Sequence, residues 1–271
     1  MRFHWRAPVR AAAAFVVVSV GVPACGPGGS TRESESPAFI TVFAASSLST
    51  VFPQIAREFS VANPREAVRF SFGGTDSLAA QIGQGAPADV FAGASATYGD
   101  RLWAARLVDR PKPFCTNSLV IVVPASNPAS LDSPRDLARQ GVKVLIGAAA
   151  VPIGTYTRQV LTNLGAEYGE GYDQRVLANV VSEEDTAEGI VSKISQGEAD
   201  AGFVYRTDQW ADAANLHSIP IDAAANVFAT YSIAAIVGGT RTLEARAFVG
   251  FVLSSPGQRL LRAAGFGPPP E

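Results

Sequence analysis

The sequence predicts an α/β fold of two lobes, each a mostly parallel sheet flanked by helices, with a hinge joining them. From Phe39 onward, short apolar β-rich runs alternate with segments of helical spacing, which is the pattern of βαβ units. The alternation comes in two sets separated near residue 118. Hydrophobic residues make up 47% of the 271 residues, which is enough for one large or two medium cores.

The first set of elements occupies residues 39–118. A strand at Phe39–Ala44 gives way to a helical pattern at Leu48–Phe59, in which apolar residues recur every three or four positions. The same alternation then predicts a strand at Val68–Phe72, a helix at Leu78–Ile82, a strand at Asp89–Ala92 and a helix near Tyr98–Leu107.

The second set occupies residues 119–230, and the chain then returns. Its expected elements are strands at Leu119–Val123 and Lys143–Gly147, a helix at Thr155–Leu164, a strand near Val176–Val180, a helix at Ala187–Gln196 and a strand at Ala201–Tyr205. A strand at Tyr231–Val237 and a helical stretch at Leu243–Leu261, interrupted at Ser254–Gly257, follow. We therefore expect residues 39–118 and 231–271 to form lobe 1 and residues 119–230 to form lobe 2.

The N-terminus has the pattern of a signal peptide. Three arginines precede the apolar run Ala11–Val22, whose 12 residues suit a signal-peptide core and fall short of the roughly 18–20 that span a bilayer. The run ends in Val-Pro-Ala-Cys, and a small residue before Cys25 resembles the lipobox of bacterial lipoproteins. Ordinary secretion with an incidental cysteine is the alternative.

This interpretation divides the start of the chain into two segments. Residues 1–24 would be the lipoprotein signal peptide, and residues 25–38, rich in Gly and Ser, would be a flexible tether. The protein would then be extracytoplasmic, held at the outer face of the cell membrane, on the periplasmic side, by a lipid on Cys25.

Charge and cysteine content exclude several classes of partner. The net charge is −2, and it becomes −5 if the first 24 residues and their three arginines are removed. Nucleic acid is therefore not expected as a partner, because neutralising phosphates requires a basic surface. Cys115 is the only cysteine beyond Cys25, so we expect no internal disulfide and a buried, small apolar role for Cys115 beside Phe114.

The sequence also predicts that the protein is not an enzyme and has no cofactor. A serine hydrolase would need G-x-S-x-G and a histidine base, but Gly93–Thr97 ends in Thr and the mature chain has only His217. One histidine is too few for a typical zinc hydrolase. The P-loop and dinucleotide-binding motifs are absent. The acidic run Glu183–Asp185 is typical of a solvated helix start.

Small and hydroxylated residues recur where predicted strands turn into helices. These turns are Ser46-Ser47, Thr75 after a Gly-Gly pair, Val151–Thr155 and Asp185–Ala187, and none contains Lys or Arg. Any one of these residues could simply cap a helix. Ligands of open α/β sheets, however, collect at the carboxyl ends of strands, beside helix N-termini. Four such turns on two lobes indicate a site of neutral N–H and O–H donors for a small oxyanion.

Six motifs then carry a family resemblance: ITVFAASSL at Ile40–Leu48, GAPADVF at Gly85–Phe91, NSLVIVVP at Asn117–Pro124, VPIGTY at Val151–Tyr156, ADAGFVY at Ala199–Tyr205 and GFG at Gly265–Gly267. In this order they resemble the periplasmic molybdate-binding proteins of bacterial ABC transporters. The resemblance covers essentially Phe39 to Gly267. It implies a type II periplasmic-binding fold that captures molybdate or tungstate in the interlobe cleft for import. It also implies a membrane permease as partner, and we expect a monomer.

The resemblance also implies the ligand contacts. The serine of the family's first turn falls on Ser47, the hydroxyl of the second turn on Thr75, two main-chain N–H donors on Ile153 and Ala187, and the tyrosine that ends a strand on Tyr205. These five would contact the oxygens of molybdate, without bonding the metal directly.

Asp76 departs from the family's pattern, in which a hydroxyl residue commonly stands there. A carboxylate would repel an oxyanion unless it turns away or the ligand carries a proton. Phosphate, sulfate, thiosulfate and a metal cation therefore stay open as alternative ligands.

Overall fold

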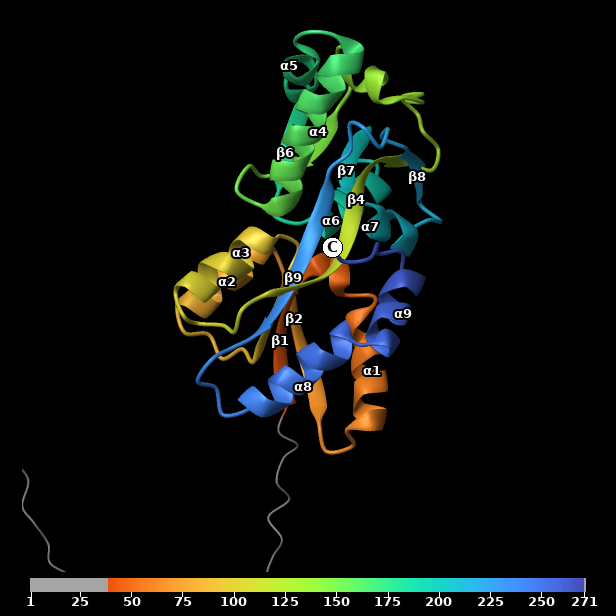
Figure 1. The fold of residues 1–271 in the computed structure, drawn as a ribbon. Helices are drawn as coiled ribbons and strands as arrows, with labels where there is room; N and C mark the ends of the chain where they lie inside the picture. The colour runs from red at the N-terminus through yellow and green to blue at the C-terminus, as the bar shows by residue number, and fades with distance from the viewer. Residues whose placement is uncertain (1–38, 271) are drawn as a thin grey trace, which may run out of the picture. The chain divides into compact units, whose positions relative to one another are not determined.

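The computed structural model describes residues 39–270 (Figure 1). The expected signal peptide, the tether and Cys25 lie outside the described residues. Among the helices of residues 39–270, none combines the length and hydropathy that a membrane span requires.

Nine strands of the described chain form the sheet. They are β1 (Phe39–Ala45), β2 (Ala67–Gly73), β3 (Val90–Gly93), β4 (Lys112–Pro124), β5 (Val144–Gly147), β6 (Val180–Glu184), β7 (Ala201–Tyr205), β8 (Leu216–Ile219) and β9 (Phe228–Ala235). Their order is β2-β1-β3-β9-β4-β7-β5-β6, and β8 pairs with β4.

The helices alternate with these strands. They are α1 (Phe52–Ala62), α2 (Thr75–Gly83), α3 (Ala96–Ala104), α4 (Pro152–Tyr168), α5 (Tyr172–Leu177), α6 (Ala187–Ser195), α7 (Arg206–Ala211), α8 (Thr242–Leu253) and α9 (Ser255–Ala263), with short 3-10 helices η1 (Ser46–Leu48) and η2 (Pro134–Ala138). Their alternation with the strands confirms the predicted α/β class.

Two groups of parallel strands are joined by two long strands. Strands β1, β2 and β3 are parallel, and so are β5, β6 and β7. β4 and β9 run antiparallel between the two groups, as Figure 1 shows. β4 pairs with β9 up to Ser118 and with β7 from Leu119. This change of partner coincides with the expected lobe boundary at residue 118, and the boundary itself stays a prediction.

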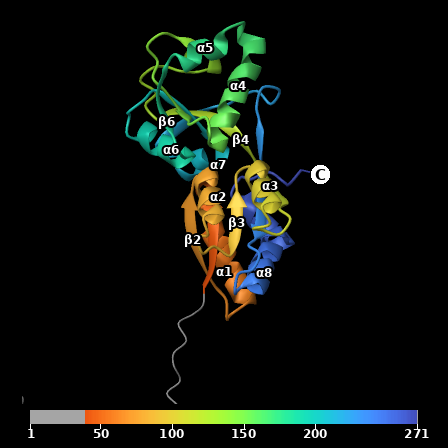
Figure 2. The same ribbon diagram turned by 90° about the vertical axis from the view of Figure 1, so that its left-hand side faces the viewer.

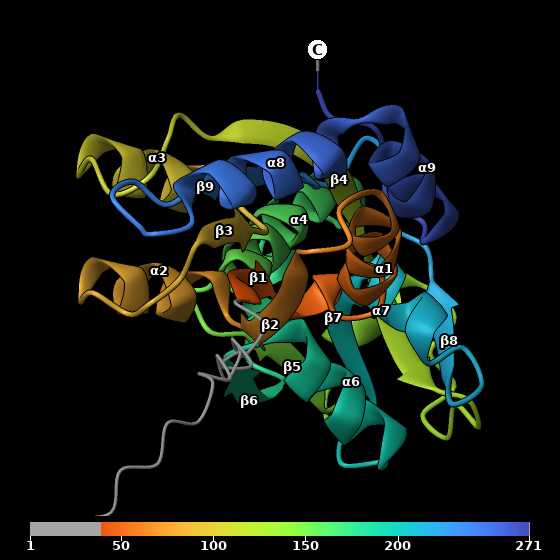
Figure 3. The ribbon, with the colours of Figure 1, turned by 90° about the horizontal axis from the view of Figure 1, so that it is seen from below.

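Helices cover both faces of the β1–β3 group. Helices α2 and α3 pack on one face through Leu78, Ile82 and Leu102, and they lie toward the viewer in Figure 2. Helices α1 and α8 pack on the other face, where the rings of Phe59 and Phe248 meet edge to face with centroids 5.3 Å apart. Figure 3 shows these two pairs of helices on separate sides of the strands.

The predicted strand near Val176–Val180 is wrong. Tyr172–Leu177 is helix α5, whose buried residues Tyr172 and Val176 are four positions apart and share one face. Strand β6 begins only at Val180, after Asn179 has closed the helix by donating its N–H to the carbonyl of Val176. The apolar run therefore spans the end of a helix and the start of a strand.

Several other elements extend or divide the predicted ones. Strand β4 begins at Lys112, seven residues before the expected start. The helical stretch at Leu48–Phe59 is divided into η1 and α1, with Pro53 in the first turn of α1. Cys115 is fully buried beside Phe114, as expected, and burial raises the pKa of its thiol well above the usual value.

Candidate functional site

The five predicted contact residues lie around one small cavity. Ser47, Thr75, Ile153, Ala187 and Tyr205 all line it, although they come from five different elements. The remaining lining residues are Ala45, Ser46, Gly73, Gly74, Ala94, Val151, Pro152, Asp185 and Thr186. The volume of the cavity is about 20 Å³. This is far below the range of roughly 300–1,000 Å³ for pockets that hold drug-sized ligands, so the cavity suits only a very small solute.

Thr75 begins α2 and presents a hydroxyl whose proton is free. Its Oγ1 accepts a hydrogen bond from the Ala94 N–H at 3.0 Å, so its own O–H remains available to a ligand. The side chain is almost fully buried. Gly93 allows this packing, because a Cβ there would lie 2.8 Å from Thr75 Cγ2.

Ser47 lies in η1, immediately after strand β1. Its Oγ is 2.8 Å from the Oη of Tyr231, and the serine is half-buried at the cavity wall. The first strand-to-helix turn therefore supplies a second hydroxyl, held by a buried tyrosine from β9.

Ile153 contributes its main chain through the start of α4. Pro152 has no N–H, and the first hydrogen bond of the helix is donated by the Thr155 N–H to the carbonyl of Val151. The N–H of Ile153 therefore has no acceptor inside the helix. The helix start packs directly on the end of β5, because a Cβ on Gly154 would lie 1.9 Å from the Ala148 carbonyl oxygen.

Ala187 contributes its main chain through the start of α6. The N-cap residue Thr186 accepts the Gly189 N–H on its side chain at 3.1 Å and the Ile190 N–H on its carbonyl. This cap leaves the N–H of Ala187 without an intrahelical acceptor. Ala187 is 3% exposed, so its N–H lies in largely dry surroundings.

Tyr205 ends strand β7 with its phenol in the cavity. The side chain is 3% exposed, and its Oη is buried without a hydrogen-bond partner among the described residues. Burial raises the pKa of Tyr205 well above its usual value, so the phenol stays neutral and can donate its proton. A buried hydroxyl without a partner is costly, and a ligand oxygen would satisfy it.

The electrostatics of the cavity favour an anion bound by neutral donors. Helices α2, α4 and α6 all begin at its wall, and helix N-termini carry partial positive charge. No Lys or Arg lines the cavity. Arg158, one turn into α4, instead donates to Glu183 and to the carbonyls of Gly147 and Gly154.

Two acidic residues, Asp185 and Asp76, lie near the cavity. Asp185 lines the cavity, but this residue is exposed. Asp76 is half-buried and is not among the lining residues. Within residues 39–270, no group of three or more His, Cys, Asp or Glu residues lies together in a way that could hold a metal ion.

Sequence reasoning missed the residues that support the cavity from behind. Tyr231, Asn117 and Thr207 form a buried polar group next to Ser47. Asn117 begins one of the six motifs, but the motif assigns it no role, and Tyr231 is 184 residues from Ser47 in the sequence. Each of the three lies between polar or charged neighbours in the sequence, so no hydrophobic pattern marks it as buried.

The fold has two groups of strands bridged by β4 and β9, and a small cavity lined by hydrogen-bond donors lies between the starts of their helices. This arrangement is that of a solute-binding protein. The family of bacterial extracellular solute-binding proteins matches residues 40–267, and the chain belongs to this family. The protein is therefore of an extracytoplasmic type.

Known proteins similar to this chain include molybdate-binding and sulfate-binding proteins. The chain is 36% identical over 258 residues to the molybdate-binding protein ModA of Mycobacterium tuberculosis, an alignment that covers 95% of this chain and 94% of that protein. Its fold is similar to that of the periplasmic molybdate-binding protein of Azotobacter vinelandii, with a TM-score of 0.73, 22% identity and coverage of 85% and 100% of the two chains. It is equally similar to the sulfate-binding protein SubI of M. tuberculosis, with a TM-score of 0.76, 19% identity and coverage of 85% and 86%. The fold alone therefore does not select the oxyanion.

Proposed function

We propose that the protein is the substrate-binding protein of an ABC importer and captures molybdate or tungstate in this cavity. The observation that carries the proposal is that five residues able to offer neutral donors line one small cavity, in which none of the described lining residues is Lys or Arg. The five residues are Ser47, Thr75, Ile153, Ala187 and Tyr205. Family membership and the 36% identity to a molybdate-binding protein support it. The protein delivers its ligand to a membrane permease, acts as a monomer and catalyses no reaction.

Neutral donors are sufficient for such a ligand. A hydrogen bond to a charged group contributes about 1.5–3 kcal/mol, and preoriented donors lose little entropy on binding. Five of them offset the cost of ordering and desolvating a small dianion. Affinity then comes from the short-range donors, because long-range attraction is weak in a protein of negative net charge.

Calorimetric titration of the purified protein with molybdate, tungstate, sulfate and phosphate tests the proposal. We expect molybdate and tungstate to bind with similar high affinity and the smaller sulfate to bind much more weakly. Tightest binding of sulfate or phosphate, or no binding of any of the four, would contradict the proposed ligand.

Phosphate is the second candidate, because Asp76 follows directly after a contact residue and its Oδ1 is buried without a partner among residues 39–270. A carboxylate accepts a hydrogen bond from a protonated oxyanion but repels molybdate. Because Asp76 does not line the cavity, we expect Asp76→Ser to leave molybdate affinity unchanged or to improve it. Loss of anion binding in this variant would instead favour phosphate.

We also propose that a lipid on Cys25 holds the protein at the membrane. The Arg-rich start, the short apolar run and the small residue before Cys25 support this anchor. We expect Cys25→Ala to release the protein from the membrane fraction, as seen by immunoblotting of fractionated cells. Mass spectrometry of the native protein that finds cleavage elsewhere and no acyl chain would contradict the anchor.

A further inference from the structure

Next to the cavity, a series of polar side chains linked by hydrogen bonds runs from Ser47 to Thr207 in α7. Tyr231 on β9 is fully buried, and its Oη lies 2.8 Å from Ser47 Oγ. The Nδ2 of Asn117 on β4 lies 3.5 Å from the same Oη and donates to Thr207 Oγ1 at 2.8 Å. Thr207 is two residues after Tyr205. The series of hydrogen-bonded side chains therefore begins at one proposed contact residue, Ser47, and ends close to another, Tyr205.

Either hydroxyl of the Ser47–Tyr231 pair can donate, and the orientation of the neighbouring Asn117 amide favours donation by Tyr231. The Tyr231 hydroxyl has one proton, and Asn117 turns its N–H toward it and therefore cannot accept that proton. Ser47 Oγ is the acceptor within reach. A serine that accepts from Tyr231 keeps its own O–H free to donate, as Thr75 does when it accepts from Ala94.

We propose that Tyr231 is a positioning residue for oxyanion binding: by donating to Ser47 Oγ, it holds the serine with its O–H directed at the ligand. The inference rests on the proposed function of the cavity and adds a residue that the ligand does not touch. Without the tyrosine hydroxyl, the serine rotor is free to turn or to donate elsewhere, and part of the preorganisation is lost.

The surroundings of Tyr231 keep its hydroxyl in this role. Its ring packs edge to face against Phe114, Tyr205 and Phe266, with centroids 5.5–6.1 Å apart, so its position is fixed on several sides. Burial raises the pKa of Tyr231 well above its usual value, so the proton stays on the phenol.

A double-mutant cycle between Tyr231→Phe and Ser47→Ala tests the proposal, with molybdate affinity measured by calorimetry. We expect Tyr231→Phe to weaken binding about 3- to 10-fold, in line with the loss of one neutral hydrogen bond. In the Ser47→Ala background the same change should have no further effect, because the hydroxyl that it positions is gone.

Tyr172→Phe is the matched control. Tyr172 is also buried, and its hydroxyl donates to the Pro134 carbonyl at 2.5 Å in a part of the chain that does not line the cavity. We expect this variant to keep wild-type affinity even if its melting temperature falls. A purely structural role for Tyr231 would instead lower the melting temperature without a change in affinity that depends on Ser47.

The outcomes separate this inference from the proposed function. If wild-type protein binds none of the four oxyanions, the proposed function fails. If wild-type protein binds molybdate but Tyr231→Phe binds equally well, or its effect persists in the Ser47→Ala background, the inference alone is overturned. Should Tyr231→Phe not fold, Asn117→Leu removes the amide that directs the tyrosine proton, and the same Ser47-dependent loss is expected. Unchanged affinity in Asn117→Leu would overturn the inference.

Discussion

At the scale of single residues, the site depends on hydroxyl groups whose acceptor capacity is already used inside the protein. Thr75 accepts from the Ala94 N–H, and Ser47 is within hydrogen-bond distance of Tyr231. Removing either hydroxyl deletes a donor to the ligand and leaves the internal partner unsatisfied. We expect Ser47→Ala and Thr75→Ala each to weaken molybdate binding by about 10- to 100-fold, the range for one hydrogen bond to a charged group. Calorimetry measures the loss.

Arg158→Ala is the control for this prediction. Arg158 lies close to the site in sequence, but its guanidinium donates to Glu183, to the Gly147 carbonyl at the end of β5 and to the Gly154 carbonyl in α4. We expect its removal to change affinity much less than the loss of either hydroxyl. A larger effect of Arg158→Ala would mean that the anion is held by charge, contrary to the neutral-donor site.

Four of the five proposed contact residues lie in local turn patterns of the sequence, whereas the fifth, Tyr205, is placed only by the family resemblance. Ser47, Thr75 and Ala187 follow strands directly in the sequence, and parallel strands bring such turns to one edge. Tyr231 and Asn117 could not be found in this way, since they lie inside strands. Tyr231 meets Ser47 because β9 pairs with β3 and β3 with β1, and Asn117 reaches Tyr231 through the pairing of β4 with β9. Contacts over 184 residues leave no local signal.

At the scale of secondary-structure elements, apolar strands were predicted closely, even the four-residue strands β3 and β5, while the short elements α7 and β8 were not predicted. The run at Phe39–Ala44 is β1 with one more residue, because it is apolar throughout and ends at a serine turn. Helix α7 has only six residues, and strand β8 has four, of which two are exposed. Such elements are stabilised by their neighbours and not by their own periodicity.

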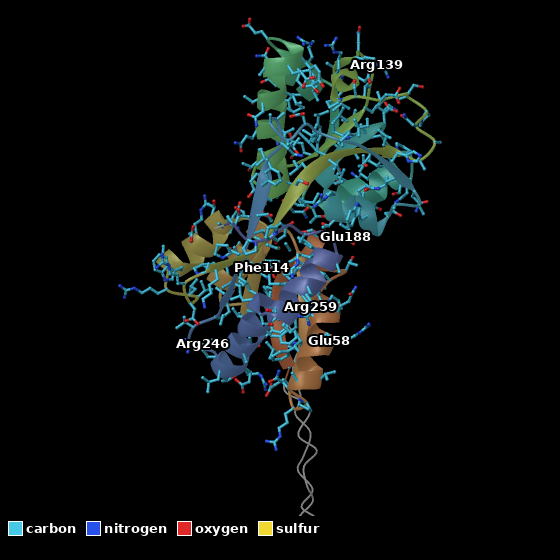
Figure 4. The ribbon with its side chains drawn as sticks, turned by 45° about the vertical axis from the view of Figure 1, so that its right-hand side comes forward. Glu58, Phe114, Arg139, Glu188, Arg246 and Arg259 are labelled. Atoms are coloured by element: carbon cyan, nitrogen blue, oxygen red, sulfur yellow. The ribbon has the colours of Figure 1, made fainter. Side chains whose placement is uncertain are left out.

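Helix α7 gives the protein a pH-dependent stability through Asp208. The carboxylate accepts the Tyr205 N–H at 3.1 Å, which lowers its pKa, but burial is the larger effect, and the nearby Glu188 adds to it. Glu188 is the second residue of α6 and is labelled in Figure 4. Together these effects raise the pKa of Asp208 from 3.8 to about 7.

The sign of the pH dependence follows from this shift. Between pH 4 and about 7, folded Asp208 keeps a proton that the unfolded chain releases, so this group's contribution to stability falls as the pH rises. Asp208→Asn keeps an acceptor for the Tyr205 N–H but does not titrate. We therefore expect the variant to gain free energy of unfolding relative to wild type as the pH rises through this window. Urea unfolding at several pH values measures it, and parallel profiles for the two proteins would contradict the shifted pKa.

At the scale of the whole folded unit, β4 and β9 are the two long strands that run between the groups of parallel strands. Direct hydrogen bonds also cross between the proposed lobes near the cavity. Tyr98 on α3 donates to the Ala150 carbonyl at 2.6 Å, and Tyr156 on α4 lies 3.4 Å from the Ala94 carbonyl. These bonds are made to exposed or partly exposed groups, so they stabilise the contact only modestly.

A ligand would add contacts that exist only when the two sides approach. Ser47 and Thr75 lie on the side of β1–β3, whereas Ile153, Ala187 and Tyr205 lie on the side of β5–β7. An oxyanion bound by both sets shifts the population toward the closed arrangement by the free energy of its second set of bonds.

We expect small-angle scattering to show a smaller radius of gyration on addition of molybdate, with the crossings of β4 and β9 acting as the hinge. The double variant Ser47→Ala/Thr75→Ala, which lacks both hydroxyls of one side, should show no compaction at the same concentration. If the ligand-free protein is shown to be open and its radius of gyration stays unchanged at saturating molybdate, then the two lobes do not close around the ligand. Closure brings both sets of donors onto one ion and must therefore reduce the radius of gyration.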